Sequence, residues 1–139
     1  MKVVYPEGKT TDQFPILEPI LIQKPQQYRS RFLVNKGTFL IKINVEDVAF
    51  FYMSNGILYA VNFSKEEFRI DLQIKNVEED LNPDIFRRVN RQVILNVNSI
   101  YRIEPYFNGK LVVKTIPEFP TKIIVSKQNA KPFKDWIDQ

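Results

Sequence analysis

The sequence predicts a mostly β protein that consists of short strands and two short helices. Apolar, β-branched and aromatic residues form short runs through most of the chain, which is the pattern expected of strands. Turn residues separate these runs, and Asn-Gly between two of them is typical of an antiparallel hairpin. Only two stretches place apolar residues at helical spacing. These observations favour about eight to ten strands.

Residues 1–30 are expected to form a linker or an N-terminal arm ahead of a single domain at residues 31–139. Prolines at positions 6, 15, 19 and 25 disfavour regular structure there. Several apolar residues nevertheless argue against a purely disordered segment: Phe14, Ile16, Leu17, Ile20, Leu21 and Ile22. The arm is therefore compatible with packing on its own domain and with binding another protein.

The sequence of the first half of the domain predicts two hairpins and one further strand. Their expected strands cover residues 31–34, 38–43, 45–53, 57–63 and 68–70. Asn35-Lys36-Gly37 and Ser54-Asn55-Gly56 supply the two turns. A helix is expected at residues 72–81, with Asp71 as its N-cap. Its acidic run at 78–80 is best explained as a solvated face, because successive helix positions diverge.

The second half begins with an arginine-rich strand at residues 86–96. A hairpin follows at 101–116, with Asn108-Gly109 as its turn, and then a strand at 122–125. A terminal helix is expected to begin near Asn129, because a helix tolerates Pro132 only in its first turn. Its apolar stripe consists of Phe133, Trp136 and Ile137.

The composition argues against an enzyme and against a bound cofactor. The 139 residues include no histidine and no cysteine, which removes thiolate nucleophiles, disulfides, the usual histidine base and the common zinc sites. Ser126-Lys127 is the nearest candidate for a catalytic pair, but adjacent residues point in different directions. Nothing resembles a signal peptide or a membrane-spanning helix. A cytoplasmic protein without a membrane partner is expected.

Basic residues concentrate in the last third of the chain. Residues 86–139 contain ten basic and four acidic residues, whereas residues 31–85 contain six and nine. Within the arginine-rich run, Arg88, Asn90, Arg91 and Asn96 interrupt a series of apolar residues. Guanidinium groups bind phosphate or guanine, and carboxamides pair with adenine. This run therefore indicates a double-stranded DNA partner.

The order of features from residue 32 onward resembles the LytTR DNA-binding domain, the output module of a class of bacterial response regulators of the LytR/AlgR type. The resemblance rests on these segments: Glu46-Asp47-Val48, Tyr52-Met53-Ser54-Asn55-Gly56, residues 72–81, residues 86–96 and Val125-Ser126-Lys127. Asn90-Arg91-Gln92, residues 106–110 and residues 133–136 resemble the Bacteroidetes variety. The resemblance implies an elongated, mostly antiparallel fold that inserts loops into successive major grooves, usually at paired direct repeats in promoters.

The resemblance also implies which residues contact DNA. They are Ser54 and Asn55 in the hairpin turn, Asn96 after the apolar run, Lys127 after Val-Ser, and Arg88, Asn90 and Arg91 from the arginine-rich strand. Two departures from the family pattern stand out. Lys127 occupies a position where the family usually has arginine, so a bidentate contact would become a point-charge contact. The turn at 54–56 lacks the base-reading histidine of some members.

Structural alternatives exist for several of these residues. Asn96 is also compatible with capping a turn, because Asn98 and Ser99 follow it. The arginines are also compatible with ion pairs to the acidic helix, and Gln92 is interpreted as a packing or hydrogen-bonding residue rather than a reader of bases.

The leading hypothesis is a sequence-specific transcription regulator domain of a two-component system. It would form a homodimer on DNA, and a phosphoacceptor receiver domain is expected to be missing from this chain. The alternative is a protein-interaction module that uses its edge strands and the proline-rich arm for β-addition.

Overall fold

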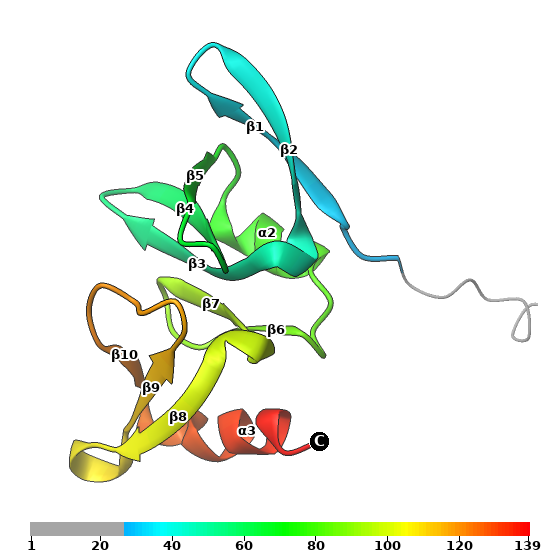
Figure 1. The fold of residues 1–139 in the computed structure, drawn as a ribbon. Coiled ribbons are helices and arrows are strands. Elements are labelled where there is room, and N and C mark those ends of the chain that lie inside the picture. Colours follow the sequence, from blue (N-terminus) through cyan, green and yellow to red (C-terminus); the bar gives the residue numbers. More distant parts are fainter. Residues whose placement is uncertain (1–26) are drawn as a thin grey trace, which may run out of the picture.

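The computed structural model describes residues 27–139, which form three antiparallel sheets and two α-helices (Figure 1). The mostly β prediction is confirmed by this architecture. Most of the predicted N-terminal arm lies outside the described residues. Its last part is tied to the domain, because the backbone N–H of Arg29 donates to the Asp80 carbonyl at 2.8 Å and its guanidinium pairs with the Asp80 carboxylate.

The first sheet is the two-stranded hairpin of β1 (Arg31–Lys36) and β2 (Phe39–Asn44). Phe32 and Val34 alternate with Leu33 along β1, as the two-residue period of a strand requires. Phe32 and Val34 are buried, whereas Leu33 on the opposite face is 68% exposed. One face of this hairpin therefore packs on the domain and the other carries an exposed apolar side chain.

The central sheet has the strand order β5-β4-β3-β7-β6. Its strands are β3 (Val48–Ser54), β4 (Ile57–Asn62), β5 (Glu67–Ile70), β6 (Phe86–Arg88) and β7 (Val93–Asn96). Neighbouring residues of β3 belong to different cores, because side chains alternate between the two faces. Phe51 packs in one core with β1, β2 and α2 (Ile74–Asp80), and Phe50 packs in the other with β9, β10 and α3 (Lys127–Ile137).

The third sheet has the order β10-β9-β8 and stands with α3 on the side of the central sheet away from the first hairpin (Figure 1). Its strands are β8 (Ile100–Pro105), β9 (Leu111–Thr115) and β10 (Ile123–Val125). Short 3-10 turns join some of the elements: η1 (Val45–Asp47), η2 (Val97–Ser99) and η3 (Phe107–Gly109). The hairpin predicted at 101–116 is confirmed as β8 and β9, and Asn108 in its turn is left-handed with φ of 55°.

Three sequence predictions of local structure are wrong. The helix predicted at 72–81 with Asp71 as its N-cap is α2, which begins at Ile74 with Gln73 at the N-cap position. The arginine-rich run is two strands, β6 and β7, joined by a tight loop at 89–92. The terminal helix begins at Lys127 rather than near Asn129, so that Pro132 lies inside it. Packing compensates for the backbone bond that proline cannot make, because Phe133 and Trp136 are buried and the Trp136 indole N–H donates to the Pro83 carbonyl at 2.7 Å.

Tyr52 makes the stability of the sheet sensitive to high pH. Its hydroxyl donates to Glu67 Oε1 at 2.6 Å. Burial, and then this carboxylate, raise the pKa of Tyr52 to about 12 from the usual 10.0. Because this pKa is raised, the neutral phenol of Tyr52 contributes fully to the free energy of unfolding below pH 10. That contribution is lost as the pH rises through 12.

We therefore expect Tyr52→Phe to flatten the decline in the free energy of unfolding between pH 10 and pH 12. Urea unfolding at a series of pH values measures this decline. Tyr101→Phe, at an exposed position of β8, is the matched control and should decline as the wild type does. A wild-type decline in Tyr52→Phe would show that this phenol is not the responsible group.

Candidate functional site

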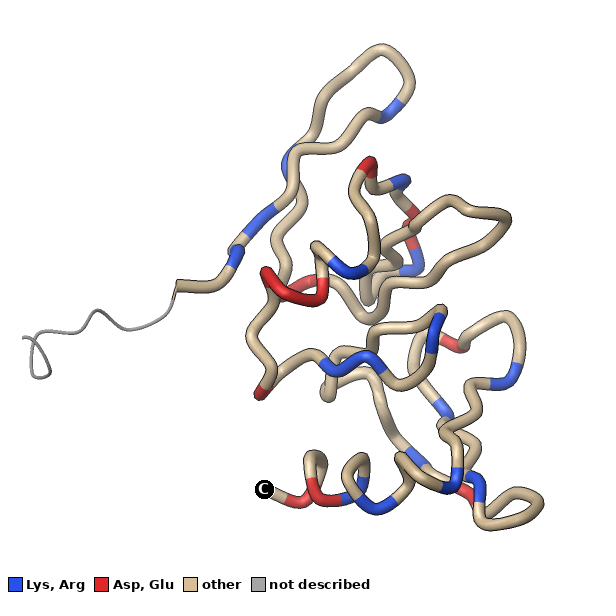
Figure 2. The backbone as a smooth tube through the Cα atoms, turned by 180° about the vertical axis from the view of Figure 1, so that it is seen from behind, with Lys and Arg blue, Asp and Glu red and all other residues tan. Residues whose placement is uncertain are grey.

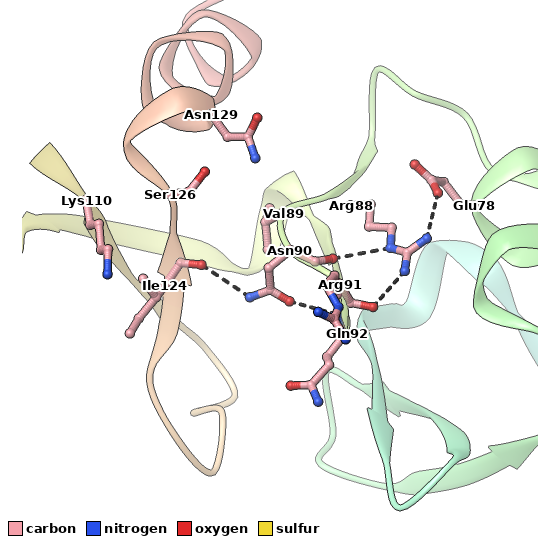
Figure 3. Close-up of a pocket in the computed structure, with 10 residues that line it drawn as sticks. All are labelled: Glu78, Arg88, Val89, Asn90, Arg91, Gln92, Lys110, Ile124, Ser126 and Asn129. Atoms are coloured by element: carbon pink, nitrogen blue, oxygen red, sulfur yellow. Dashed lines mark hydrogen bonds and ion pairs between the residues drawn. The ribbon is translucent and has the colours of Figure 1, made fainter.

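A groove of about 960 Å³ lies where the loop between β6 and β7 faces the third sheet and the start of α3 (Figure 3). Its lining residues come from separate parts of the sequence: Glu78, Arg88, Val89, Asn90, Arg91, Gln92, Lys110, Ile124, Ser126 and Asn129. Three of them are cations, and the single carboxylate, Glu78, pairs with Arg88 at 3.3 Å. The groove therefore presents net positive charge.

The guanidinium of Arg88 holds the β6–β7 loop from inside (Figure 3). Its Nη2 donates to the Arg91 carbonyl at 2.7 Å, and its Nε donates to the Asn90 carbonyl at 3.2 Å. Its Nη1 donates to Glu78 Oε1 on α2. The alternative that an arginine pairs with the acidic helix is thus what the structure shows for Arg88, which acts here as a positioning residue.

Asn90 fixes the loop from its other side. Its carboxamide nitrogen donates to the Ile124 carbonyl of β10 at 3.3 Å, and its Oδ1 accepts the Gln92 backbone N–H at 2.8 Å. Both polar atoms of this side chain are therefore engaged within the protein. Direct contacts of Arg88 and Asn90 with DNA remain predictions.

Arg91 and Gln92 are the two residues that the loop exposes. The Gln92 carbonyl accepts the backbone N–H of Met53 at 2.9 Å, so the β3–β4 turn begins directly beside the loop. Ser54 and Asn55 of that turn are exposed. The structure thus brings the predicted residues Ser54, Asn55 and Arg91 into neighbouring segments.

Lys127 follows Ser126, which lines the groove, but is not itself among the lining residues. It is exposed, and its aliphatic stem packs over Gly109, where a Cβ atom would approach the Lys127 Cγ to 3.1 Å. Gly109 also has φ of +77°, which side chains rarely adopt. Gly109 therefore leaves room for the lysine stem beside Lys110.

The start of α3 adds to the positive character of the groove. The backbone N–H groups at the beginning of a helix lack partners within the helix and carry a partial positive charge. No acidic residue lies in the first turn of α3. Figure 2 shows mostly basic residues on the third sheet and the start of α3, whereas acidic residues alternate with basic ones around α2 and β5. The charge asymmetry predicted from the sequence therefore has a spatial counterpart.

Asn96 was predicted to contact DNA, but the structure places its side chain in the core. Its side chain is 1% exposed, its Nδ2 donates to the Val48 carbonyl at 2.9 Å, and its Oδ1 accepts the Asn98 backbone N–H at 2.8 Å. A side chain that is buried and bonded at both ends is not presented to a base edge. Asn96 caps η2 and joins β7 to β3, which is the alternative that the sequence left open.

Sequence reasoning did not select Gln92, Lys110 or Asn129 as site residues, although all three line the groove. Each is a single exposed polar residue beside a turn or a helix start. Such positions carry no pattern of their own, and their shared location depends on how the third sheet packs against the β6–β7 loop.

Two structural features are absent from residues 27–139. This part of the chain contains no cluster of three or more acidic, histidine or cysteine residues suited to holding a metal ion. None of its helices has the length and apolar character needed to cross a bilayer.

Comparisons with known proteins bear on the family and the fold of this chain. The family model described as the LytTr DNA-binding domain matches residues 39–138. One similar solved structure is the LytTr DNA-binding domain of a "putative methyl-accepting/DNA response regulator" from Bacillus cereus. It superimposes with a TM-score of 0.68 at 19% identity, covering 80% of this chain and 99% of that chain, which supports a shared fold. The comparison with curated proteins gave no match.

The burial of Asn96 predicts a loss of stability on substitution. Asn96→Ala leaves the Val48 carbonyl without its partner and uncaps η2, so we expect the free energy of unfolding to fall by about 1–3 kcal/mol. Chemical denaturation measures the change. Asn98→Ala removes an exposed carboxamide two residues away and should stay within about 0.5 kcal/mol of the wild type. Equal effects of the two substitutions would contradict the structural role of Asn96.

Proposed function

Because the chain belongs to the LytTR family of DNA-binding domains, we propose that it binds double-stranded DNA in a sequence-specific manner as the output domain of a bacterial two-component response regulator. In this role it controls transcription from promoters in the cytoplasm. The function needs no cofactor and no catalytic group.

The observation that carries the proposal is the positively charged groove lined by Arg91 and Lys110, with the turn at Ser54 and Asn55 beside its loop and Lys127 directly after the lining residue Ser126. DNA carries closely spaced phosphates, and cations that neutralise them release condensed counterions. Arg91 and Lys110, together with the first turn of α3, can contact phosphates of one backbone. Loops of the domain are then inserted into successive major grooves, and the neighbouring β6–β7 loop and β3–β4 turn enter one of them together.

Arg91 and Lys127 contribute differently to DNA binding. Arg91 offers a planar fork that binds phosphate or guanine bidentately. Lys127 offers a point charge with less geometric specificity than the arginine usual in the family. We therefore expect Lys127 to contribute mainly to the affinity for DNA. Arg91 is expected to contribute to the affinity and also to fix the position of the domain along the duplex.

Regulation would lie outside the described residues. We propose that a receiver domain elsewhere in the regulator promotes dimerisation, and that two copies then occupy paired direct repeats. Linking two copies raises the effective concentration of the second at its site, so dimerisation increases occupancy without any new DNA contact.

The proposal predicts that Arg91→Ala and Lys127→Ala each weaken binding to every duplex sequence. Each substitution should also reduce the slope of log affinity against log salt by about 0.9, because each removes one phosphate contact. Fluorescence anisotropy of a labelled duplex over a salt series gives both quantities.

Lys134→Gln is the matched control, since Lys134 is an exposed cation in the last turn of α3, at the end away from the groove. Lys134→Gln should give almost the same slope of log affinity against log salt as the wild type. A wild-type affinity that does not fall as salt rises would rule out phosphate neutralisation as the source of binding.

A second candidate function, a protein contact, is favoured by the β1–β2 hairpin. Leu33 and Leu40 are diagonal neighbours on its outer face, at 68% and 62% exposure, and Phe39 at its turn is 71% exposed. Contiguous exposed apolar groups mark interaction surfaces. We propose a second copy of this chain as the partner, because a twofold contact needs only one self-complementary patch.

Leu33→Asp and Leu40→Asp should shift a monomer–dimer equilibrium toward the monomer by placing charges in the contact. Sedimentation equilibrium over a range of concentrations measures the shift. Tyr101→Asp introduces the same charge at an exposed aromatic position of β8 and should leave the equilibrium unchanged. A wild-type chain that stays monomeric at all concentrations, with and without duplex DNA, would contradict this contact.

A further inference from the structure

Gln92 is an exposed residue whose side chain lines the open groove. Among residues 27–139, its carboxamide makes no hydrogen bond, and Figure 3 shows it extending away from the cluster formed by Arg88 and Asn90. The carboxamide of Asn90, two residues earlier, is bonded at both of its polar atoms. The loop therefore contains one carboxamide that fixes the fold and one that is available to a ligand.

The backbone of Gln92 is fixed on both sides. Its N–H donates to Asn90 Oδ1 at 2.8 Å, and its carbonyl accepts the Met53 N–H at 2.9 Å. The Arg88 guanidinium holds the preceding carbonyl, that of Arg91. Because the backbone is ordered before any ligand binds, only the side-chain rotamers of Gln92 lose entropy on contact.

A neutral carboxamide suits a base better than a phosphate. It carries one donor group and one acceptor, and this pair matches the N7 acceptor and the N6 amino donor of adenine in the major groove. It does not neutralise a phosphate, so it adds little to the salt-dependent part of the affinity. The neighbouring Arg91 supplies that part.

We propose that Gln92 determines specificity by reading the adenine of an A·T base pair through a bidentate contact of its carboxamide. The inference rests on the proposed DNA-binding function and gives it a defined base preference. Arg88 and Asn90 are positioning residues for this contact, because they fix the backbone on either side of it.

The test begins with selection of duplexes from a random pool by the full chain, followed by anisotropy on the selected duplex and on its single-base-pair variants. The wild type should prefer A·T at one position by about 5- to 150-fold over the other pairs. Gln92→Ala should lose that preference while its salt slope and its preferences at other positions stay as in the wild type.

Two variants sharpen the assignment. Asn129→Ala removes another exposed carboxamide that lines the same groove, and it should retain the A·T preference. Gln92→Glu offers acceptors only, so the preference should move toward C·G, where the cytosine amino group donates. Arg88→Lys removes the guanidinium fork that holds the loop and should weaken the A·T preference at the same base pair. A residue that only stabilises the fold would weaken binding equally at all base pairs.

A duplex with 7-deazaadenine at the preferred position removes the N7 acceptor alone. It should weaken wild-type binding but have almost no effect on Gln92→Ala, because the two changes remove the same contact. An unchanged A·T preference in Gln92→Ala would overturn the inference while leaving the DNA-binding function in place. A wild-type chain that binds no duplex would instead overturn the proposed function, and this inference with it.

Discussion

The hydrogen bonds of the Arg88 guanidinium hold together the part of the molecule on which the candidate site depends. One side chain joins Glu78 of α2 to the carbonyls of Asn90 and Arg91. With these carbonyls fixed, the chain reverses direction within four residues between β6 and β7. The exposed Arg91 and Gln92 then occupy defined positions instead of a range of loop conformations.

The double-sided central sheet explains why this loop lies where it does. Phe50 and Leu95 pair across β3 and β7 on one face, and Phe51 and Ile94 pair on the other. Since both faces are buried, polar side chains that must reach a ligand can lie only at strand ends and turns. The β3–β4 turn, the β6–β7 loop and the start of α3 are such positions.

Most of the fold could be predicted from the sequence because Asn-Gly turns and alternating apolar residues are local signals. The site could be predicted only in part, because burial depends on tertiary packing. Asn96 follows an apolar run and has the pattern of an exposed polar residue. Its carboxamide nevertheless donates to the carbonyl of Val48, which is far away in the sequence but lies on the neighbouring strand β3. Arg88 and Arg91 have the same side chain, but Arg88 bonds to Glu78 and to the carbonyls of Asn90 and Arg91, whereas Arg91 is exposed. The break at residues 89–92 lacks the glycine or proline of a typical turn, and it is held by bonds of Arg88 and Asn90 within the loop and to other elements.

Hydrogen exchange of the backbone amides in the full chain, followed by NMR, tests the central claim most directly. If the loop is held as described, the Gln92 amide is protected in the wild type, and Asn90→Ala removes that protection while the amide of Ile94 in β7 stays protected. A Gln92 amide that exchanges at the rate of an unstructured peptide in the wild type would contradict the account, because Arg91 and Gln92 would then lack a fixed backbone.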